Sequence, residues 1–432
     1  MQSIRRQAAL LASTCLLLCA PRLLRSADWL QFRGPEGRGT SSETGLPVKW
    51  SADQNIVWKT PLPGFGASSP ITFGRNIFLT CYSGYGLDKQ APGQKRNLRL
   101  HVVCLDLDGK VKWDKNIPAR QPPRIDNQTD YVGFTALHGY ASGTPVSDGK
   151  ALFAFFGETG VVAYDLDGQQ LWTANVGTKT HGFGTGTSPI LSENLLIVNA
   201  SIESESLVAL DKANGREVWR APEIKDSWNT PVLVDAPGGR KELVVITYDK
   251  MAAFEPRTGQ PLWNSAGSKP PRYICPSATT FENVVYAVHG YFGPATAVRS
   301  GGRGDVAATH QLWSVKKGSN VSSPVYHAGH LYWSNEQGMA FCVDAANGKV
   351  VYQERLDPPP GDVYASPVVA DGRIYYVSRK KGAFVLSAQP RFEILSHNVI
   401  ADDDSTFNAS PVVAGKGLLL RSDKFLYLVR SK

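Results

Sequence analysis

The sequence predicts an all-β fold, an eight-bladed β-propeller of four-stranded antiparallel blades, and two repeated patterns lead to this prediction. The first is a Ser/Thr–Pro pair followed by β-branched residues, which recurs every 42–48 residues from Pro145 onward. The second follows most of these prolines by about 30 residues and combines a small residue, Asp, Gly and Trp. A repeat of this length containing four strand-like segments is typical of propeller blades.

The proline of each repeat marks the first strand of a blade. The residue before a proline favours an extended backbone, and the first residue of a strand tolerates the missing N–H. Eight such starts predict eight blades, although one of them is the degenerate copy CPSA. The prolines are Pro70, Pro145, Pro189, Pro231, Pro276, Pro324, Pro367 and Pro411.

The second pattern predicts the third strand, a tight turn and the fourth strand. In AYDLDGQQLW (Ala163–Trp172), Gly supplies a positive φ and Asp can hydrogen-bond its own backbone. We interpret the repeated aspartates as turn residues rather than catalytic carboxylates, and the repeated tryptophans as packing between blades. They are Asp106, Asp165, Asp211 and Asp344, and Trp58, Trp113, Trp172, Trp219, Trp263 and Trp313.

The last repeat supplies only three strands before the chain ends. The missing fourth strand is expected at the other end of the propeller, in NIVWKTPL (Asn55–Leu62). An N-terminal strand that completes the C-terminal blade closes the ring and removes an open edge. The predicted organisation is therefore a signal peptide or anchor at 1–27, an N-terminal extension at 28–54 and a single propeller at 55–432.

The N-terminus resembles an export signal. Arg5 and Arg6 precede a 13-residue apolar run, Ala8–Ala20, which is short for a membrane span. The alternative is an uncleaved anchor, because neither Ala20 nor Ala27 ends a good cleavage site. We expect an exported protein, periplasmic or extracellular, with no membrane span in the mature chain.

Charge and cysteine content exclude several classes of protein. The formal charge of +8 falls to +4 without residues 1–27, which is too weak for a nucleic-acid-binding protein of this size. Outside the signal, no cysteine spacing indicates a zinc site, and we predict no metal. Cys104 and Cys342 occupy the small-residue position of the repeat, as buried apolar groups. A disulfide between Cys81 and Cys275 stays open.

The Asp–Gly–Trp signature resembles the tryptophan-docking repeat of pyrroloquinoline-quinone (PQQ) type propellers, from about Trp58 to the C-terminus. That group includes PQQ-dependent alcohol dehydrogenases and a propeller lipoprotein of outer-membrane assembly. The opening, Asp28–Trp50, further resembles exported PQQ-like repeat proteins of planctomycete-type bacteria. The resemblance implies PQQ with calcium, but the chain lacks the adjacent cysteines of the quinone enzymes. We therefore expect no cofactor and favour a protein without enzymatic activity.

Enlarged loops are expected to gather on one face of the propeller. That face holds the loops that lead into the proline strands and the loops that join the second strand of a blade to its third strand. The largest are Tyr82–Asn97, Asp114–Tyr140 and His289–Asp305. Insertions on one face of a rigid ring commonly carry function. The ligand-binding candidates at this mouth are His138, Tyr140, His181, Phe183, Trp228, Tyr273, His289, Tyr291 and Arg303.

The stretch HGFGTGTSP (His181–Pro189) has the glycine content of a phosphate-binding loop. Such a loop needs a preceding strand, a following helix and usually a lysine, whereas here a strand follows. Similar stretches, PGFGASSP and HGYASGTP, enter other blades. We interpret the glycines as the hinge into the innermost strand, and His138 with His181 as a candidate pair at the channel mouth.

Two further patterns stay open at this level. ADDDSTFN (Ala401–Asn408) spaces Asp402, Asp404 and Thr406 like calcium ligands, but it lacks the glycine and terminal glutamate of an EF-hand, so a solvated acidic loop is favoured. Glycosylation-like triplets occur at four asparagines, and chance is the favoured explanation. They begin at Asn127, Asn199, Asn320 and Asn408.

These observations favour an exported, monomeric binding scaffold for a protein, peptide or glycan, held on the looped face. A cofactor-dependent oxidoreductase and an outer-membrane assembly factor are the alternatives. Neither Cys15 nor Cys19 lies in a good lipidation sequence.

Overall fold

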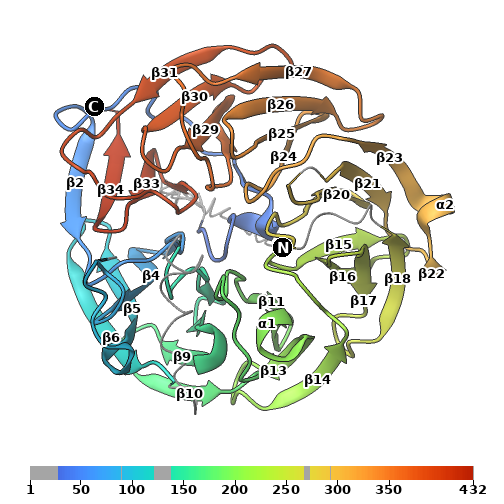
Figure 1. Ribbon diagram of the computed structural model, residues 1–432, viewed down its shortest axis with the longest axis horizontal. Helices are drawn as coiled ribbons and strands as arrows, with labels where there is room; N and C mark the ends of the chain where they lie inside the picture. The colour runs from blue at the N-terminus through green and yellow to red at the C-terminus, as the bar shows by residue number, and fades with distance from the viewer. Residues whose placement is uncertain (1–27, 89, 121–137, 267–272, 292, 432) are drawn as a thin grey trace, which may run out of the picture.

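The computed structural model describes residues 28–88, 90–120, 138–266, 273–291 and 293–431, and its eight sheets surround a central axis (Figure 1). The predicted all-β, eight-bladed propeller is therefore confirmed. In each blade the strands lie side by side and antiparallel, with the first at the axis and the fourth at the rim. The predicted signal at residues 1–27 lies outside the described residues.

The first four blades follow one another in chain order. Their strands are, for blade 1, β3 (Ile71–Phe73), β4 (Asn76–Ser83), β5 (Arg99–Asp106) and β6 (Val111–Pro118); for blade 2, β7 (Val146–Ser147), β8 (Ala151–Phe155), β9 (Val161–Asp165) and β10 (Gln170–Ala174); for blade 3, β11 (Ile190–Ser192), β12 (Leu195–Ala200), β13 (Ser206–Asp211) and β14 (Glu217–Pro222); and for blade 4, β15 (Val232–Ala236), β16 (Arg240–Ile246), β17 (Lys250–Phe254) and β18 (Pro261–Ala266).

The remaining four blades complete the ring. Their strands are, for blade 5, β19 (Thr279–Phe281), β20 (Val284–Val288), β21 (Ala295–Arg299) and β23 (Gln311–Val315); for blade 6, β24 (Val325–His327), β25 (His330–Ser334), β26 (Met339–Asp344) and β27 (Val350–Arg355); for blade 7, β28 (Val368–Ala370), β29 (Arg373–Val377), β30 (Ala383–Ser387) and β31 (Ile394–Asn398); and for blade 8, β32 (Val412–Ala414), β33 (Gly417–Arg421), β34 (Phe425–Arg430) and β2 (Ile56–Pro61).

Blade 8 joins the two ends of the propeller, as the sequence predicts. Strand β2 pairs antiparallel with β34, with Trp58 opposite Leu428, and the two strands lie together in Figure 1. Three strands from the C-terminus and one from the N-terminal region therefore make one sheet. This pairing leaves no blade with an unfilled fourth position.

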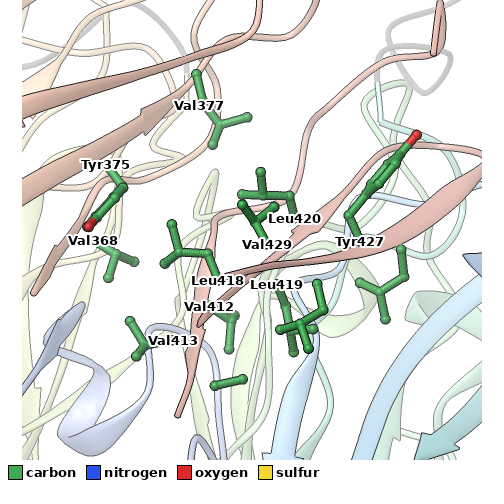
Figure 2. Close-up of a cluster of buried hydrophobic side chains, with 14 of the residues drawn as sticks. Val368, Tyr375, Val377, Val412, Val413, Leu418, Leu419, Leu420, Tyr427 and Val429 are labelled. Carbon is green, nitrogen blue, oxygen red and sulfur yellow. The ribbon is translucent and has the colours of Figure 1, made fainter. Parts of the chain in front are cut away.

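The hydrophobic core lies between the faces of neighbouring blades rather than in one central mass. Figure 2 shows one such cluster, in which Val368 and Tyr375 of blade 7 lie near Val412 and Leu418 of blade 8. All four side chains are at most 1% exposed. Each blade is thus stabilised by burial against its two neighbours.

Tryptophans of the fourth strands dock five of the eight blades onto the next blade. The Trp219 indole donates from Nε1 to the Pro256 carbonyl at 3.0 Å, and its ring covers Gly259 in the turn of blade 4. A Cβ on Gly259, whose φ is +71°, would lie 2.4 Å from the indole. The same contact joins Trp58 to Gly109, Trp113 to Gly168, Trp172 to Gly215 and Trp313 to Gly348.

The junction between blades 4 and 5 departs from this pattern. Trp263 donates instead to the carboxylate of Glu242 at 2.6 Å, and the Glu242 side chain is fully buried. The segment after β21 adds strand β22 (Gly304–Asp305), which pairs parallel with β18, and the short helix α2 (Ala307–His310). This insertion takes the place of the short glycine turn that a tryptophan covers at the five junctions described above.

The expected loop at His289–Asp305 is therefore not one loop. Its segment Ala295–Arg299 is the third strand of blade 5, β21, because it pairs antiparallel with β20 on one side and with β23 on the other. Arg303 directly precedes β22, at the rim of blade 4 (Figure 1), where its Nη1 lies 3.8 Å from the Glu242 carboxylate. The expectation that Arg303 lies at the channel mouth is wrong.

Few helical turns occur in the described residues. They are η1 (Pro35–Gly37), η2 (Lys95–Asn97), η4 (Gly157–Thr159), α1 (Ser201–Ser204) and α2. None of the helices in the described ranges has the length and apolar character needed to cross a membrane.

Candidate functional site in the central channel

The residues paired with the repeat prolines form a closed ring of hydroxyl groups around the channel, which we call the hydroxyl ring. The backbone N–H of each donates to the hydroxyl oxygen of its counterpart in the next blade, at 2.9–3.1 Å. The last of these bonds, from Ser410 N to Ser69 Oγ, closes the circle. The ring consists of Ser69, Thr144, Ser188, Thr230, Ser277, Ser323, Ser366 and Ser410.

Each ring hydroxyl keeps its proton for another partner. Its oxygen accepts one backbone N–H, and a hydroxyl also donates one hydrogen bond of its own. Within the described part of the chain, no residue accepts these eight protons, and all eight residues line the channel cavity. The wall of the cavity therefore offers both donors and acceptors.

The N-terminal segment crosses one end of the channel. It begins at blade 1, where Trp29 and Thr72 exchange two backbone hydrogen bonds, and it continues past blade 2, where Ser147 N donates to Leu30 O. Its strand β1 (Thr40–Ser41) then pairs parallel with β28 of blade 7. The blue N-terminal segment accordingly lies near the centre of the ring in Figure 1.

Arg33 anchors this segment on the side opposite Trp29. Its guanidinium donates to the Ala278 carbonyl at 3.3 Å and also to the Pro324 carbonyl, so it connects blades 5 and 6. Burial lowers the pKa of Arg33 to about 9. The neighbouring Phe32 is part of the cavity lining, and we call Phe32 with the segment around it the floor of the cavity.

Aromatic side chains surround the open end, which we call the mouth. The Phe183 ring lies 4.9 Å from Tyr273 and 5.8 Å from Trp228 between ring centres. Trp228 is held by its Nε1–H, which donates to the Gly184 carbonyl at 2.8 Å. Tyr364 adds a fourth aromatic group from the blade 7 entry loop.

His138 lies at the same level, behind the aromatic groups. Its Nε2 donates to the Phe183 carbonyl at 2.5 Å, and its Nδ1 contacts the Ser142 hydroxyl. Burial lowers the pKa of His138, so the imidazole is neutral at pH 7. Because both ring nitrogens are engaged, His138 positions the loop around Phe183 rather than offering a free base.

The cavity between floor and mouth has a volume of about 170 Å³ and an uncharged lining. Hydroxyls, amides, aromatic rings and the half-buried Cys275 thiol make up its wall. Burial raises the pKa of Cys275 to about 12, so the thiol is protonated. The Asn320 Oδ1 atom is buried and has no hydrogen-bond partner in the described chain, which leaves an acceptor at the cavity wall.

The structure brings four of the nine candidate residues to this cavity: His138, Phe183, Trp228 and Tyr273. His181 lies on the outside of the mouth, where it stacks on Phe183 and contacts Trp228. The imidazole pair is therefore divided, with His138 in the wall and His181 exposed outside it.

The other candidates lie away from the channel cavity. Tyr140 packs against Tyr82 and Tyr85 beside a smaller pocket. His289 is buried within blade 5, where its Nε2 contacts the Thr296 hydroxyl at 2.9 Å and burial lowers its pKa to about 4. Tyr291 is not among the lining residues of the channel cavity.

Sequence reasoning missed Phe32, Asn320, Tyr364 and the hydroxyl ring. The ring did have a sequence signal, because a serine or threonine stands beside every repeat proline. The start of the first strand needs only the proline, so the repeated hydroxyl calls for another explanation. Phe32 has no such signal, since it comes from outside the repeats. The predicted site therefore captures part of the mouth and omits the wall and the floor.

The two open patterns have plain structural explanations. Lys59 and Lys424 pair with the carboxylates of Asp402 and Asp404, and none of the described residues forms a cluster suited to a metal ion. Asn199 is 1% exposed and donates to the Asn229 carbonyl at 2.8 Å. Asn127 lies outside the described residues.

All four cysteines that the structure describes are free.

The lining residues do not fit PQQ with calcium. PQQ carries carboxylates that require cationic partners, and calcium requires a set of oxygen ligands that includes carboxylates. The wall provides neutral hydroxyl, amide, thiol and aromatic groups instead. We therefore derive no reaction through this cofactor.

Comparison with known proteins identifies relatives of the same architecture. The family model described as outer membrane protein assembly factor BamB matches residues 99–303 and 302–390. None of the curated protein sequences matches this chain.

Solved structures with low sequence identity share the fold. BamB from Moraxella catarrhalis has a TM-score of 0.60 at 15% identity, covering 87% of this chain and 98% of its own. The quinohemoprotein alcohol dehydrogenase ADHIIG from Pseudomonas putida HK5 has a TM-score of 0.59 at 10% identity, covering 94% and 80%. The computationally designed Ika8 protein has a TM-score of 0.58 at 11% identity, covering 87% and 99%.

Proposed function

This chain belongs to the family described as outer membrane protein assembly factor BamB, and on that premise we propose that it is an exported, non-enzymatic binding scaffold. Its ligand, a protein, peptide or glycan, is held on the looped face at the mouth of the channel. The observation that carries the proposal is a channel cavity with Phe32 in its floor and aromatic side chains around its mouth. Concave aromatic sites with a few oriented polar groups are typical of ligand binding.

The protonation states at the mouth agree with a binding role. The imidazole of His138 has both nitrogens engaged, and burial raises the pKa of the Tyr273 and Tyr364 phenols. General acid–base catalysis at neutral pH needs a group that titrates near that pH and reaches the substrate. His138 instead makes a hydrogen bond through each ring nitrogen, and both phenols stay protonated at neutral pH.

The test is a binding screen with the full chain against a displayed peptide library and a glycan array. We expect the selected ligands to lose binding to the variant Trp228→Ala and to keep it on Leu312→Ala. Leu312 is 37% exposed on β23 at the rim, so its truncation leaves the mouth intact. Ligands that bind Trp228→Ala and wild type equally would contradict the proposal.

The family description favours one alternative, a role in outer membrane protein assembly. It is tested by adding a labelled, urea-denatured outer-membrane β-barrel polypeptide to the immobilised full chain. Saturable capture that is independent of Trp228 would favour this alternative over a channel ligand. For the oxidoreductase alternative, we expect no dye reduction with added PQQ and Ca²⁺, because the lining lacks the groups that both require.

A further inference from the structure

We propose that the channel cavity binds the terminal sugar residue of a neutral glycan. This inference rests on the proposed function, because it names the ligand class of the same site. Three properties of the cavity carry it: the uncharged wall, the pairing of the hydroxyl ring with aromatic faces, and the floor.

The uncharged wall selects a neutral ligand. An ionised group buried against hydroxyls and aromatic rings loses its hydration without gaining a counter-charge. The nearest cation at the mouth, Arg379, already lies over the Tyr364 ring and 3.5 Å from the Asp362 carboxylate. Acidic sugars, phosphates and quinone carboxylates therefore have no matching partner among the lining residues.

The hydrogen-bonding groups match alcohol hydroxyls. Each ring hydroxyl has a proton to donate and a remaining lone pair, and the buried Asn320 Oδ1 is an acceptor without a partner in the described chain. A ligand that only accepts would leave Asn320 unsatisfied, and a ligand that only donates would leave the ring protons unsatisfied. Sugar hydroxyls both donate and accept, so they satisfy the two kinds of group together.

The aromatic mouth matches the other face of a sugar ring. Phe183, Trp228 and Tyr273 contact one another edge to face or tilted, so their rings point in several directions around the opening. A pyranose carries apolar C–H groups on its faces and hydroxyls around its edge. Aromatic surfaces bury such C–H groups while the polar edge stays available for hydrogen bonds.

The floor determines which part of a glycan enters. A volume of about 170 Å³ holds on the order of ten water molecules. A hexose residue contains a similar number of non-hydrogen atoms, so the cavity has room for one such residue. Because the N-terminal segment with Phe32 crosses the channel between this cavity and the pocket on its other side, a ligand enters from the mouth with its end first. The geometry therefore points to end-on recognition of one terminal residue.

The experiment measures binding of the labelled full chain to an array of neutral and acidic glycans, followed by calorimetric titration. The titration compares the best neutral oligosaccharide with its counterpart that ends in the corresponding uronic acid. We expect neutral glycans with a shared terminal residue to bind, and the uronic acid to bind at least ten-fold more weakly. Phe183→Ala and Asn320→Ala should each weaken neutral binding about ten-fold. Leu312→Ala is the matched control and should bind as wild type.

Several outcomes would overturn the inference. Acidic glycans that bind as tightly as neutral ones would contradict the uncharged wall, and unchanged binding in both Phe183→Ala and Asn320→Ala would place any glycan elsewhere. Melting temperatures show whether the variants fold, and Phe183 is only half-buried in a loop. If no glycan binds while a peptide or protein requires Trp228, the inference falls and the proposed function stands. If no ligand of any class depends on Trp228, both fall.

Discussion

The propeller contains two concentric sets of repeated contacts, an outer one and an inner one, and they differ in what they leave exposed. In the outer set, an indole such as Trp219 covers a turn glycine of the next blade and donates to a carbonyl there. In the inner set, a hydroxyl such as Ser366 accepts a backbone N–H from the preceding blade. In the outer contact, the indole N–H of the tryptophan is already hydrogen-bonded. In the inner contact, the hydroxyl proton of the serine or threonine stays available at the channel.

This difference separates stability from function in one repeat. The outer contacts are buried and depend on shape, so changes there should destabilise the fold. The inner contacts line a cavity that water can enter, so water can replace a lost hydroxyl. A repeat that supplies both can keep its blades docked while the channel is adapted to a ligand. The following predictions test this separation.

The largest effect is expected from truncating an outer tryptophan. Trp219→Ala removes a side chain that is 8% exposed and should lower the free energy of unfolding by about 3–5 kcal/mol. Urea denaturation measures the change. The control is Val218→Ala on the same strand, where the side chain is 48% exposed and the effect should be small. Equal losses for both variants would mean that the outer contacts do not dock the blades.

The dependence of the unfolding free energy on pH should come from residues outside the outer and inner sets of contacts, since neither set contains an ionisable side chain. Burial lowers the pKa of His289 to about 4, so only the unfolded chain takes up this proton as pH falls from 6.5 to 4, and stability is lost in that window. Burial raises the pKa of Glu203 to about 7, so only the unfolded chain releases this proton between pH 4.5 and 7, and stability is lost as pH rises. Each effect amounts to about 3 kcal/mol.

Two variants separate these opposing effects. Relative to wild type, His289→Asn should gain stability as pH falls from 7 to 4, and Glu203→Gln should gain stability as pH rises from 4 to 8. Guanidinium denaturation at a series of pH values provides the comparison. A pH dependence that is unchanged in both variants would place the titrating groups elsewhere, including in the rings.

A smaller loss is expected when the turn glycine of the outer contact is replaced. Gly259→Ala puts a Cβ against Trp219 at a φ of +71° and should cost about 2 kcal/mol in unfolding free energy. Gly372→Ala is the matched control, because its φ is +66° and nothing lies within 4 Å of the added Cβ. The difference between the two melting temperatures isolates the indole contact from the backbone cost, and no difference would argue against docking.

The smallest effect is expected in the hydroxyl ring. Ser366→Ala removes the acceptor of the Ser323 N–H and should cost about 1 kcal/mol, because the cavity lets water take its place. Ser366→Thr keeps the hydroxyl, as Thr144 and Thr230 already do in other blades, and should melt close to wild type. A loss comparable to that of Trp219→Ala would show that the hydroxyl ring is a main source of stability, and that the inner and outer contacts do not differ in this respect.

Much of this architecture could be predicted because it depends on interactions between residues that are close together in the sequence. The Asp–Gly turn places its aspartate within a few residues of the backbone groups that it binds, as when the Asp165 carboxylate accepts from Gln169 N at 2.8 Å. The position of Arg303 could not be predicted in this way. Its segment contains β21, whose short pattern differs little from that of a glycine-rich loop, and only pairing with β20 identifies it as a strand.

The sequence by itself determined the repeat period, the number of blades, the closing strand and the residue types at blade junctions, because each follows from a pattern within one repeat. The tertiary structure alone decided which repeats meet and what fills the space between them. The hydrogen bond between Ser410 and Ser69 joins residues 341 positions apart, and Phe32 reaches the channel from outside the repeats. Such contacts arise when the ring closes and brings distant segments together, and no local pattern states which of these groups will meet. For the same reason, the loops predicted only the mouth, and the uncharged wall and the floor of the cavity became known from the structure.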